Sequence, residues 1–423
     1  MIKIMNAAEA GAIINRERID YSAVEKTVAT ILAKVREEGD KALYEYTERF
    51  DKVKLNALLV TEEEISEAYN NADRYFIETL KQAGKNIAVF HKKQLRKNYA
   101  IKKKDGTIVG QRFLPLDSVG LYIPGGTAGY PSTVLMNAVP AKLAGVRELA
   151  IVTPPGKDGK VNPDVLTAAR IAGVDRIYKV GGAQAIAALA YGTQTIKKVD
   201  KIVGPGNMYV AAAKKQVFGE VGIDMIAGPS EILIISDGKS DPGCLAADLL
   251  SQAEHDKNAS AILITDSSAL AEKVSAELEK QLSVLPRESV ARASIDDHGR
   301  ILLVSRLEEA AEVSNSIAPE HLELCVDEPF ALLDKITSAG SVFLGRSTPE
   351  ATGDYFAGAN HTLPTSGTAR FSSPLSVDDF IKKSQYIFYT AAALKKNGRR
   401  IADFAEREGL QAHARSITAR TKD

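Results

Sequence analysis

The sequence predicts an α/β fold with two Rossmann-like parallel-sheet domains, a helical N-terminal arm and a helical C-terminal tail. Its 423 residues exceed what one ordinary core needs, and an apolar fraction of 45% is sufficient to fill two cores. Short β-branched runs that end in Gly or Pro alternate with helical stretches from Val119 onward, and a second such series follows. Strands that alternate with helices imply right-handed βαβ units and parallel sheets, with ligands at the carboxyl ends of the strands.

A long amphipathic region is expected to follow an arm of residues 1–22. From about Tyr21 to Val89, apolar residues recur at steps of three and four, as in "AVEKTVATILAKVREEGDKALYEYTERF". This periodicity is typical of a helical cover and does not indicate a site. The region is assigned to a first α/β domain, which comprises residues 23–121 and 231–372.

The predicted strands fall into two series. The first reads "VGLYIPGG", "ELAIVTPP", "RIYKVGG", "KIVGPG" and "DMIAGPSEILIISD", with helices such as "TVLMNAVPAKLAG" and "AQAIAALAYG" between them. The second reads "SAILITD", "RILLVS", "LELCV" and "GSVFLG". Residues 122–230 are therefore expected to form a second α/β domain. The pattern after Pro374 is helical and charged, which predicts that residues 373–423 form a helical tail outside the two sheets.

The run "HKKQLRKNYAIKKKDG" leaves two interpretations open. It could bind phosphate, or it could be a solvated helix end followed by a strand turn at Asp105-Gly106. The second is favoured, because the apolar partners that a nucleic-acid groove reader needs are absent. His91 of this run and His298 of "DDHGR" are expected to face solvent.

The composition excludes several classes of protein. Lys plus Arg and Asp plus Glu both number 54, so no overall field favours nucleic acid or an anionic membrane. No run approaches the roughly 18 uncharged residues of a spanning helix, and no signal-peptide core precedes Arg16, which predicts a cytoplasmic protein. The two cysteines, Cys244 and Cys325, exclude a disulfide framework and a Cys-rich zinc site.

No glycine-rich turn matches the GxGxxG dinucleotide fingerprint or a P-loop. The nearest, Gly204-Pro205-Gly206-Asn207, lacks the third glycine. A Rossmann-like pattern without the fingerprint is equally compatible with nucleotide binding and with plain tight turns.

Histidines next to acids or amides are the candidate metal ligands. In "LLSQAEHDKNAS", Gln252 and His255 are three residues apart and share one helix face. His321, His361 and His413 also have acids or amides nearby in the sequence. Zinc accepts nitrogen and oxygen ligands, so histidines from two segments and a carboxylate would suffice. The alternative is that each histidine merely forms a surface hydrogen bond.

Glu320 and His321 follow Pro319 directly before a predicted strand. An adjacent acid and imidazole in a desolvated cleft can divide proton transfer between them, because burial raises a Glu pKa toward that of His. We therefore expect this pair at a ligand-binding edge of a sheet.

Nine segments together resemble histidinol dehydrogenase. They are "GLYIPGG", "VGGAQAIAALAYGT", "VDKIVGPGNMYV", "IDMIAGPSEILI", "DLLSQAEHD", "PEHLEL", "SAGSVFLG", "TGDYFAGANHTLPT" and "EGLQAH". They run from Gly120 to His413 in the order of the family, and the amino-terminal helices resemble it too. The family has Rossmann-like sheets without the standard glycine motif.

The resemblance implies a zinc-dependent enzyme that performs the final step of histidine biosynthesis. Such an enzyme oxidises L-histidinol through L-histidinaldehyde to L-histidine and uses two NAD in succession. The implied zinc ligands are Gln252, His255, Asp354 and His413. The last ligand comes from the other subunit of a homodimer, which gives the charged tail a partner on which to pack.

The remaining roles implied by the resemblance concern catalysis, substrate and NAD. Glu320 and His321 would be the catalytic pair. The implied substrate contacts are Ser230, Gln252, His255, His321, Asp354, Glu408 and His413, and the NAD-side residues are Tyr122, Gln184 and Asn207. His321 would take the alcohol proton as hydride leaves, and Glu320 would activate the water that adds to the aldehyde. A structural role is favoured for His361.

Two other classes of function remain open. A zinc hydrolase or deaminase acting on a small nitrogenous ring could use the same ligands, and it would turn over without nicotinamide. A non-catalytic two-domain binding protein fits the architecture, but it would leave the "PEH" segment without a purpose. Metal-free ligand binding would identify it.

Overall fold

The computed structural model describes residues 1–9, 11, 21–125 and 129–421. The chain divides into two compact units, one of Met1–Gln94 and Leu116–Phe380 and the other of Leu95–Pro115 and Ile381–Asp423. Most of the predicted N-terminal arm, residues 10 and 12–20, lies outside the described residues, as do residues 126–128 of the predicted NAD-side domain.

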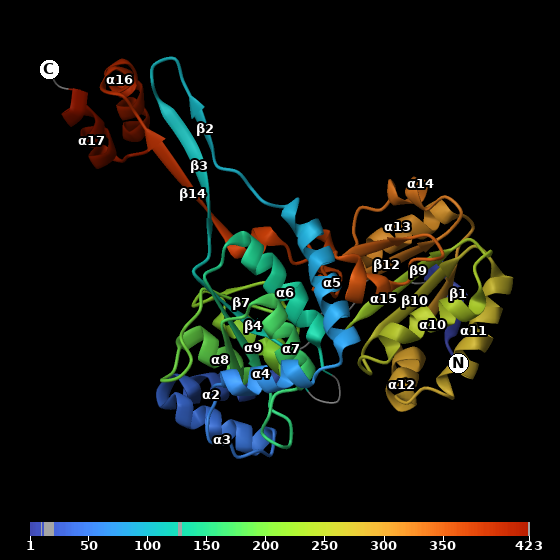
Figure 1. Ribbon diagram of the computed structural model, residues 1–423. Coiled ribbons are helices and arrows are strands. Elements are labelled where there is room, and N and C mark those ends of the chain that lie inside the picture. Colours follow the sequence, from blue (N-terminus) through green and yellow to red (C-terminus); the bar gives the residue numbers. More distant parts are fainter. Residues whose placement is uncertain (10, 12–20, 126–128, 422–423) are drawn as a thin grey trace. The chain divides into compact units, whose positions relative to one another are not determined.

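The first unit contains two parallel sheets, as predicted. Sheet A has six strands in the order β1-β11-β10-β9-β12-β13 (Figure 1). These strands are β1 (Lys3–Asn6), β9 (Glu231–Ser236), β10 (Ser260–Thr265), β11 (Arg300–Leu303), β12 (His321–Cys325) and β13 (Ser341–Leu344). The helical elements of this part are η1 (Ala7–Glu9), α10 (Pro242–Ala253), α11 (Ser268–Leu282), α12 (Glu288–His298), α13 (Leu307–Ile317), α14 (Pro329–Leu333), α15 (Glu350–Thr352), η2 (Gly353–Ala357) and η3 (Thr368–Arg370). The short η4 (Val377–Phe380) contributes Phe380 to a core of the other sheet.

Side chains of β9 alternate between the two faces of sheet A. Ile232 and Ile234 join the core formed with α10, α11 and α12, whereas Leu233 and Ile235 join the core formed with α13 and α14. Both faces are therefore buried, which explains the uninterrupted apolar run of this strand.

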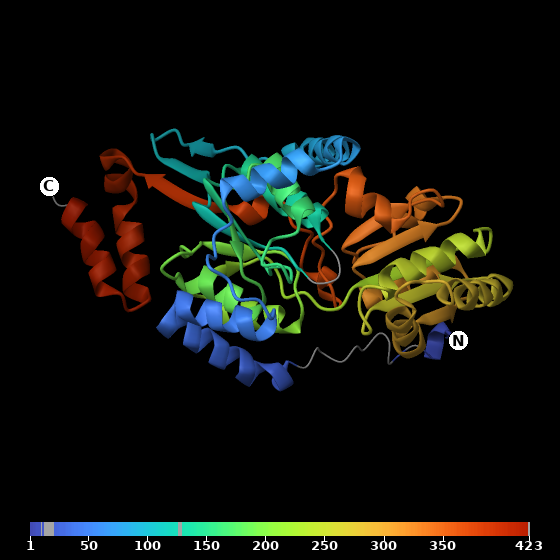
Figure 2. The same cartoon turned by 60° about the horizontal axis from the view of Figure 1, so that its bottom comes forward.

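Sheet B has five parallel strands in the order β6-β5-β4-β7-β8. These strands are β4 (Ser118–Tyr122), β5 (Glu148–Thr153), β6 (Arg176–Lys179), β7 (Lys201–Val203) and β8 (Gly222–Ile223). The surrounding helices are α2 (Ser22–Glu38), α3 (Asp40–Phe50), α4 (Glu62–Asn71), α5 (Arg74–Lys92), α6 (Pro131–Ala144), α7 (Pro163–Ala172), α8 (Gly182–Tyr191) and α9 (Met208–Val217). One core unites α2, α3, α8 and α9 with the sheet, and another unites α4 to α7 with it. The ribbons of α2 and α3 lie on one side of the sheet and those of α5 and α6 on the other (Figure 2).

The domain boundaries of the structure depart from the division that the sequence predicted. Residues 23–121 were assigned to the first domain, but helices α2 to α5 pack on sheet B, and β4 is the central strand of that sheet. A helical period identifies a buried face without identifying the core that buries it. Within the predicted arm, Lys3–Asn6 pair with Arg300–Leu303 and form an edge strand of sheet A.

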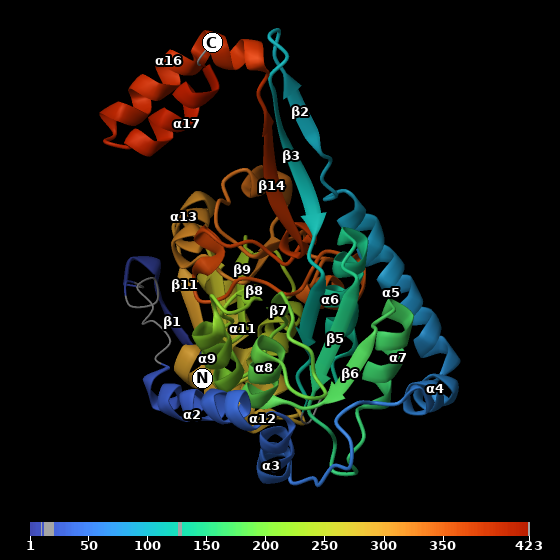
Figure 3. The same cartoon turned by 90° about the vertical axis from the view of Figure 1, so that its left-hand side faces the viewer.

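The second unit combines a three-stranded antiparallel sheet with two helices (Figure 3). Its strands are β2 (Tyr99–Lys102), β3 (Ile108–Pro115) and β14 (Ile381–Phe388), and its helices are α16 (Ala391–Arg407) and α17 (Gln411–Thr421). The predicted turn at Asp105-Gly106 is confirmed, since the Gly106 amide donates to the Lys103 carbonyl at 3.0 Å. Apart from the short η4, the predicted tail is helical only from Ala391, because Ile381–Phe388 pair with β3 from a distant part of the chain.

Two histidines predicted to face solvent differ in the structure. His298 is exposed as expected, but His91 is fully buried, and its Nδ1 lies 2.6 Å from the Gln94 side-chain oxygen. Among the described helices, none combines the length and the apolar character needed to cross a membrane.

Candidate functional site

The predicted catalytic pair lies at the amino ends of two neighbouring strands of sheet A. Glu320 directly precedes β12 and His321 begins it, while Glu231 begins the adjacent strand β9. The pair therefore does not lie at the strand carboxyl ends, where ligands were expected. The carboxyl ends of β9 and β12 are occupied instead by Arg346, which forms ion pairs with Asp237 and Asp327.

Reciprocal hydrogen bonds between the two strands fix the pair. The Glu231 amide donates to Glu320 Oε2 at 2.9 Å, and the Glu320 amide donates to Glu231 Oε2 at 3.3 Å. His321 Nδ1 lies 2.9 Å from the Glu231 carbonyl oxygen, so this nitrogen carries a proton and the ring has a defined orientation. All three side chains are buried.

The other ring nitrogen of His321 faces two carboxylates. Nε2 lies 3.9 Å from Glu350 Oε1 and 3.8 Å from Asp354 Oδ1, and it has no hydrogen-bond partner among the described residues. One ligand atom from each of these three residues lies within 4.8 Å of the others, so the group could hold a metal ion. A buried nitrogen without a partner and two carboxylates that face it fit a divalent cation.

Glu350 was not predicted from the sequence. It precedes Asp354 by four residues, and α15 continues directly into η2, so both side chains emerge on one side of a helical segment. That spacing was the available signal. The Glu350 amide donates to Glu323 Oε1 at 2.8 Å, and the Ser251 hydroxyl donates to Glu350 Oε2 at 3.2 Å, which ties the segment to β12 and α10.

The carboxylates around His321 determine the protonation of the site. Burial raises the pKa of Glu320 to about 8, and burial together with Asp354 raises that of Glu350 to about 7. Burial opposes the charged form of His321, but Glu320 and Asp354 outweigh it and raise the His321 pKa to about 10. Burial also opposes the Asp354 anion, but His321 and His361 outweigh it and lower the Asp354 pKa to about 2. A bound cation would compete with His321 for this carboxylate charge.

The two predicted ligands of the "SQAEH" segment lie at the carboxyl end of α10. Gln252 is buried in the last helical turn and lies against Glu350, while His255 is exposed just beyond the helix. The His255 amide donates to the Gln252 carbonyl at 3.1 Å, so the chain stays coiled and both residues lie near the same end. Desolvation by the surrounding residues opposes the protonated form of His255 and lowers its pKa, although the charge of the Asp354 carboxylate favours that form. Ser230 directly precedes β9, at the same edge of sheet A.

Two predicted site residues belong to the second unit. Glu408 follows α16 directly and His413 lies in α17, and both residues are exposed there. The cluster described above is made by the first unit. It brings together Glu320, His321, Gln252 and Asp354, with Glu231 and Glu350 as the residues that sequence reasoning missed.

The predicted NAD-side residues lie at the carboxyl ends of the sheet B strands. Tyr122 ends β4, Gln184 lies in the first turn of α8, and Asn207 precedes α9 and accepts hydrogen bonds from the amides of Tyr209 and Val210 at 3.0 and 3.2 Å. The Tyr122 hydroxyl accepts from the Gly182 amide at 3.1 Å, and burial raises its pKa to about 12. The strand order of the sheet reverses between β4 and β7. Open α/β sheets bind ligands at the point where the strand order reverses.

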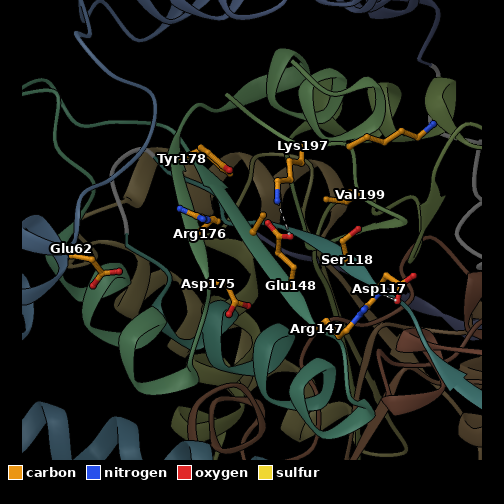
Figure 4. A pocket seen from close by; sticks show the side chains of 12 residues that line it. Glu62, Asp117, Ser118, Arg147, Glu148, Asp175, Arg176, Tyr178, Lys197 and Val199 are labelled. Atoms are coloured by element: carbon orange, nitrogen blue, oxygen red, sulfur yellow. Dashed lines mark hydrogen bonds and ion pairs between the residues drawn. The ribbon is translucent and has the colours of Figure 1, made fainter. Parts of the chain in front are cut away.

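An open groove of about 820 Å³ lies away from all of these residues, at the amino ends of the sheet B strands (Figure 4). Its lining is charged, but Arg147 pairs with Asp117 at 2.6 Å, and Lys197 pairs with Glu148 at 3.5 Å. Partner residues within the groove thus compensate these charges. The arrangement of side chains, rather than the size of a cavity, identifies the candidate site.

Comparisons with known proteins agree in one family. A family model described as histidinol dehydrogenase matches residues 14–421. The histidinol dehydrogenase of Geobacillus kaustophilus is 56% identical over 412 residues, with 97% of both chains covered, and that of Bacillus subtilis is 53% identical over 423 residues, with 100% of this chain and 99% of its own covered. The crystal structure of histidinol dehydrogenase from Elizabethkingia anophelis matches with a TM-score of 0.94 and 40% identity, and the match covers 99% of this chain and 98% of that one. This chain belongs to the histidinol dehydrogenase family.

Proposed function

We propose that this chain oxidises L-histidinol through L-histidinaldehyde to L-histidine with two NAD in succession, as the last step of histidine biosynthesis. The observation that carries the proposal is the buried Glu320–His321 pair, whose imidazole faces the Glu350 and Asp354 carboxylates. The cluster also adjoins sheet B: His361, whose Nδ1 lies 3.8 Å from Asp354, has its Nε2 at 3.3 Å from Thr133 in α6, the helix that follows β4.

Zinc is the proposed metal, held by Gln252, His255 and Asp354 together with the partner subunit's His413. These nitrogen and oxygen donors are the types that zinc accepts. Of them, Asp354 belongs to the group with His321 and Glu350 that could hold a metal ion. When bound, zinc supplies a fixed positive anchor for the amine and the imidazole nitrogen of histidinol. Ser230 and the partner subunit's Glu408 are the proposed further substrate contacts.

The catalytic pair divides the proton transfers. In its neutral form, His321 takes the hydroxyl proton of histidinol while the carbinol hydride passes to nicotinamide, which yields the aldehyde. Glu320 then accepts a proton from water as that water adds to the aldehyde carbon, and protonated His321 returns its proton to the aldehyde oxygen. The hydrate passes its hydride to a second NAD while His321 again takes a hydroxyl proton, and the carboxylic acid that results releases its remaining proton to water as the carboxylate. Tyr122, Gln184 and Asn207 are the proposed NAD contacts, because they lie at the strand carboxyl ends of sheet B, near the place between β4 and β7 where the strand order reverses.

Assembly as a homodimer is supported by the apolar surface of the second unit. Its sheet and helices expose large apolar side chains, among them Tyr99, Ile101, Val109, Tyr386, Ile387, Phe388, Phe404 and Leu410. Ile101, Val109 and Ile387 are paired across the three strands, so their side chains lie on one face of the sheet, and a large exposed apolar patch marks an interaction surface. A second copy of the chain is the proposed partner, since the site needs a His413 and a Glu408 to be complete.

Ile387→Glu should convert the dimer to a monomer and remove most histidinol oxidation. Ile387 is 71% exposed on β14, so a charge there costs little within one chain but opposes burial at an interface. Analytical ultracentrifugation and an NADH assay measure the two effects. The matched control is Phe330→Glu on α14, where Phe330 is 72% exposed and lies outside the second unit. A dimeric, fully active Ile387→Glu variant would contradict this interface.

The wild-type protein should form two NADH for each L-histidinol, and a chelator should abolish this activity until zinc is restored. The reason is that the substrate anchor is lost with the metal, while the buried pair remains. NADH absorbance with limiting histidinol gives the stoichiometry. A single NADH per histidinol would contradict the four-electron reaction, and turnover of a nitrogenous ring substrate without nicotinamide would favour a zinc hydrolase or deaminase.

A further inference from the structure

A proline inside α6 leaves one backbone carbonyl of that helix without its usual partner. Pro140 lies within Pro131–Ala144 and is buried. Proline has no amide hydrogen, so the carbonyl of Met136, four residues earlier, receives no helical hydrogen bond from it. Met136 is itself buried, at 1% exposure, and a buried carbonyl without a donor would be costly.

The side chain of Asn360 supplies the missing donor. Its Nδ2 donates to the Met136 carbonyl at 2.7 Å, and its Oδ1 accepts from the Thr362 amide at 2.9 Å. Asn360 is 4% exposed, so water does not compete for these bonds. Its Nδ2 also lies 3.5 Å from Nε2 of the buried His91. The segment that follows η2 is thereby fixed on α6 at one point.

The next residue, His361, forms a second link between α6 and the candidate site. Its Nε2 lies 3.3 Å from the Thr133 hydroxyl, one turn before Met136 on α6, and its Nδ1 lies 3.8 Å from Asp354 Oδ1. The backbone of this stretch is thus held through Asn360, and the imidazole spans from α6 to Asp354. Loss of a group that orients a metal-binding carboxylate typically lowers metal affinity by about 10- to 100-fold.

We propose that Asn360 is a positioning residue, which bonds the carbonyl left free by Pro140 and thereby holds His361 against Asp354. The proposal rests on the proposed function in so far as Asp354 is taken as a zinc ligand. The proposal also explains why Pro140 is tolerated. A proline in a helix interior is unfavourable, but here the carbonyl that it leaves free accepts a hydrogen bond from Asn360.

The test separates positioning from simple stabilisation by using three variants of the full-length protein. Asn360→Leu removes the donor and leaves the Met136 carbonyl unpaired, so both stability and zinc affinity should fall. Pro140→Ala restores a helical amide that can reach this carbonyl, and a carbonyl oxygen can accept two hydrogen bonds, so this variant should remain close to wild type. The double variant satisfies the Met136 carbonyl without Asn360, so it should recover stability while zinc affinity and kcat/KM stay low.

The expected loss of zinc affinity is about 10- to 100-fold in Asn360→Leu and in the double variant. Competition of the apo-protein with a chromophoric chelator measures this affinity, denaturant unfolding of the apo-protein measures stability, and NADH formation gives kcat/KM. If the double variant regains zinc affinity and kcat/KM together with stability, Asn360 does no more than donate a hydrogen bond to the Met136 carbonyl, and the proposal is overturned. Unchanged zinc affinity in both Asn360 variants would overturn it as well.

These outcomes remain distinct from a failure of the proposed function. Wild-type protein that binds zinc but forms no NADH from histidinol would contradict the reaction, while the zinc affinities of the variants would still decide the role of Asn360. If Asn360→Leu does not fold, the double variant carries the comparison, because its carbonyl has a helical partner.

Discussion

Glu320→Gln should lower the oxidation of L-histidinaldehyde by about 10²- to 10⁴-fold, which is the usual contribution of a positioned general base. Oxidation of added L-histidinol to the aldehyde should continue at a reduced rate, because His321 is the proposed base in that step. The amide oxygen of Gln can still accept from the Glu231 amide, which donates to Glu320 at 2.9 Å, so the pair of strands should keep its geometry. Steady-state NADH formation with each substrate separates the two half-reactions.

The pH dependence of the second oxidation provides an independent readout. Burial raises the pKa of Glu320 to about 8, and the proposed base is its ionised form. The rate of aldehyde oxidation by the wild type should therefore increase as the pH rises through that region, and Glu320→Gln should lose this increase. Glu323→Gln is the matched control, because Glu323 is also a buried carboxyl of β12 but bonds the Glu350 amide. Equal losses in both half-reactions would contradict the proposal that His321 and Glu320 act as bases in different steps.

The sequence predicted those features of the fold that depend on local pattern. Apolar runs that end in Gly or Pro identified the strands of both parallel sheets, and "EILIIS" is apolar throughout because helices α10 to α12 cover one of its faces and α13 and α14 cover the other. The three-residue spacing predicted that Gln252 and His255 share a helix face, but α10 ends at Ala253, so only Gln252 lies in the helix and His255 follows it. Pattern and spacing require no knowledge of distant parts of the chain.

Features that depend on distant contacts were not predictable in this way. Helices α2 to α5 have a clear apolar face, but the sequence does not say that sheet B rather than sheet A covers it. The position of Glu320 and His321 at the start of a strand was apparent in the sequence, but Glu231 joins them only through the pairing of β9 with β12. Glu231 appears in the sequence as one polar residue at the start of an apolar strand, which carries little information alone.

Lys214→Met should destabilise the protein by about 3–5 kcal/mol, because it leaves a buried carboxylate without its partner. Lys214 and Asp224 form an ion pair in which the side chains are 2% and 1% exposed. Both also hold the turn after β7: Lys214 Nζ donates to the Gly204 carbonyl at 2.9 Å, and the Gly204 amide donates to Asp224 Oδ2 at 2.7 Å. Denaturant unfolding of the wild type and the variant measures the loss.

The same substitution should raise KM for NAD more than KM for histidinol. Gly204 has φ +112°, and a Cβ there would lie 2.2 Å from the Tyr122 carbonyl oxygen, so the turn approaches the end of β4 closely. The ion pair keeps this approach in place beside the proposed NAD contacts Tyr122 and Asn207. Without the ion pair, the turn would hold Tyr122 and Asn207 less precisely in the positions proposed to contact NAD. The proposed metal and catalytic residues at sheet A would be unchanged.

Lys215→Met is the matched control, one residue further along α9. Lys215 pairs with Glu25 at 3.0 Å, but both side chains are nearly half exposed, so its loss should cost less than about 1 kcal/mol and leave both KM values unchanged. Adding Asp224→Asn to Lys214→Met removes the unpaired charge and should restore part of the stability but not the KM for NAD, since the Lys214 bond to Gly204 remains absent. If Lys214→Met and Lys215→Met lower stability equally, burial does not increase the contribution of the Lys214–Asp224 ion pair to stability. The turn after β7 would then be held by its backbone alone.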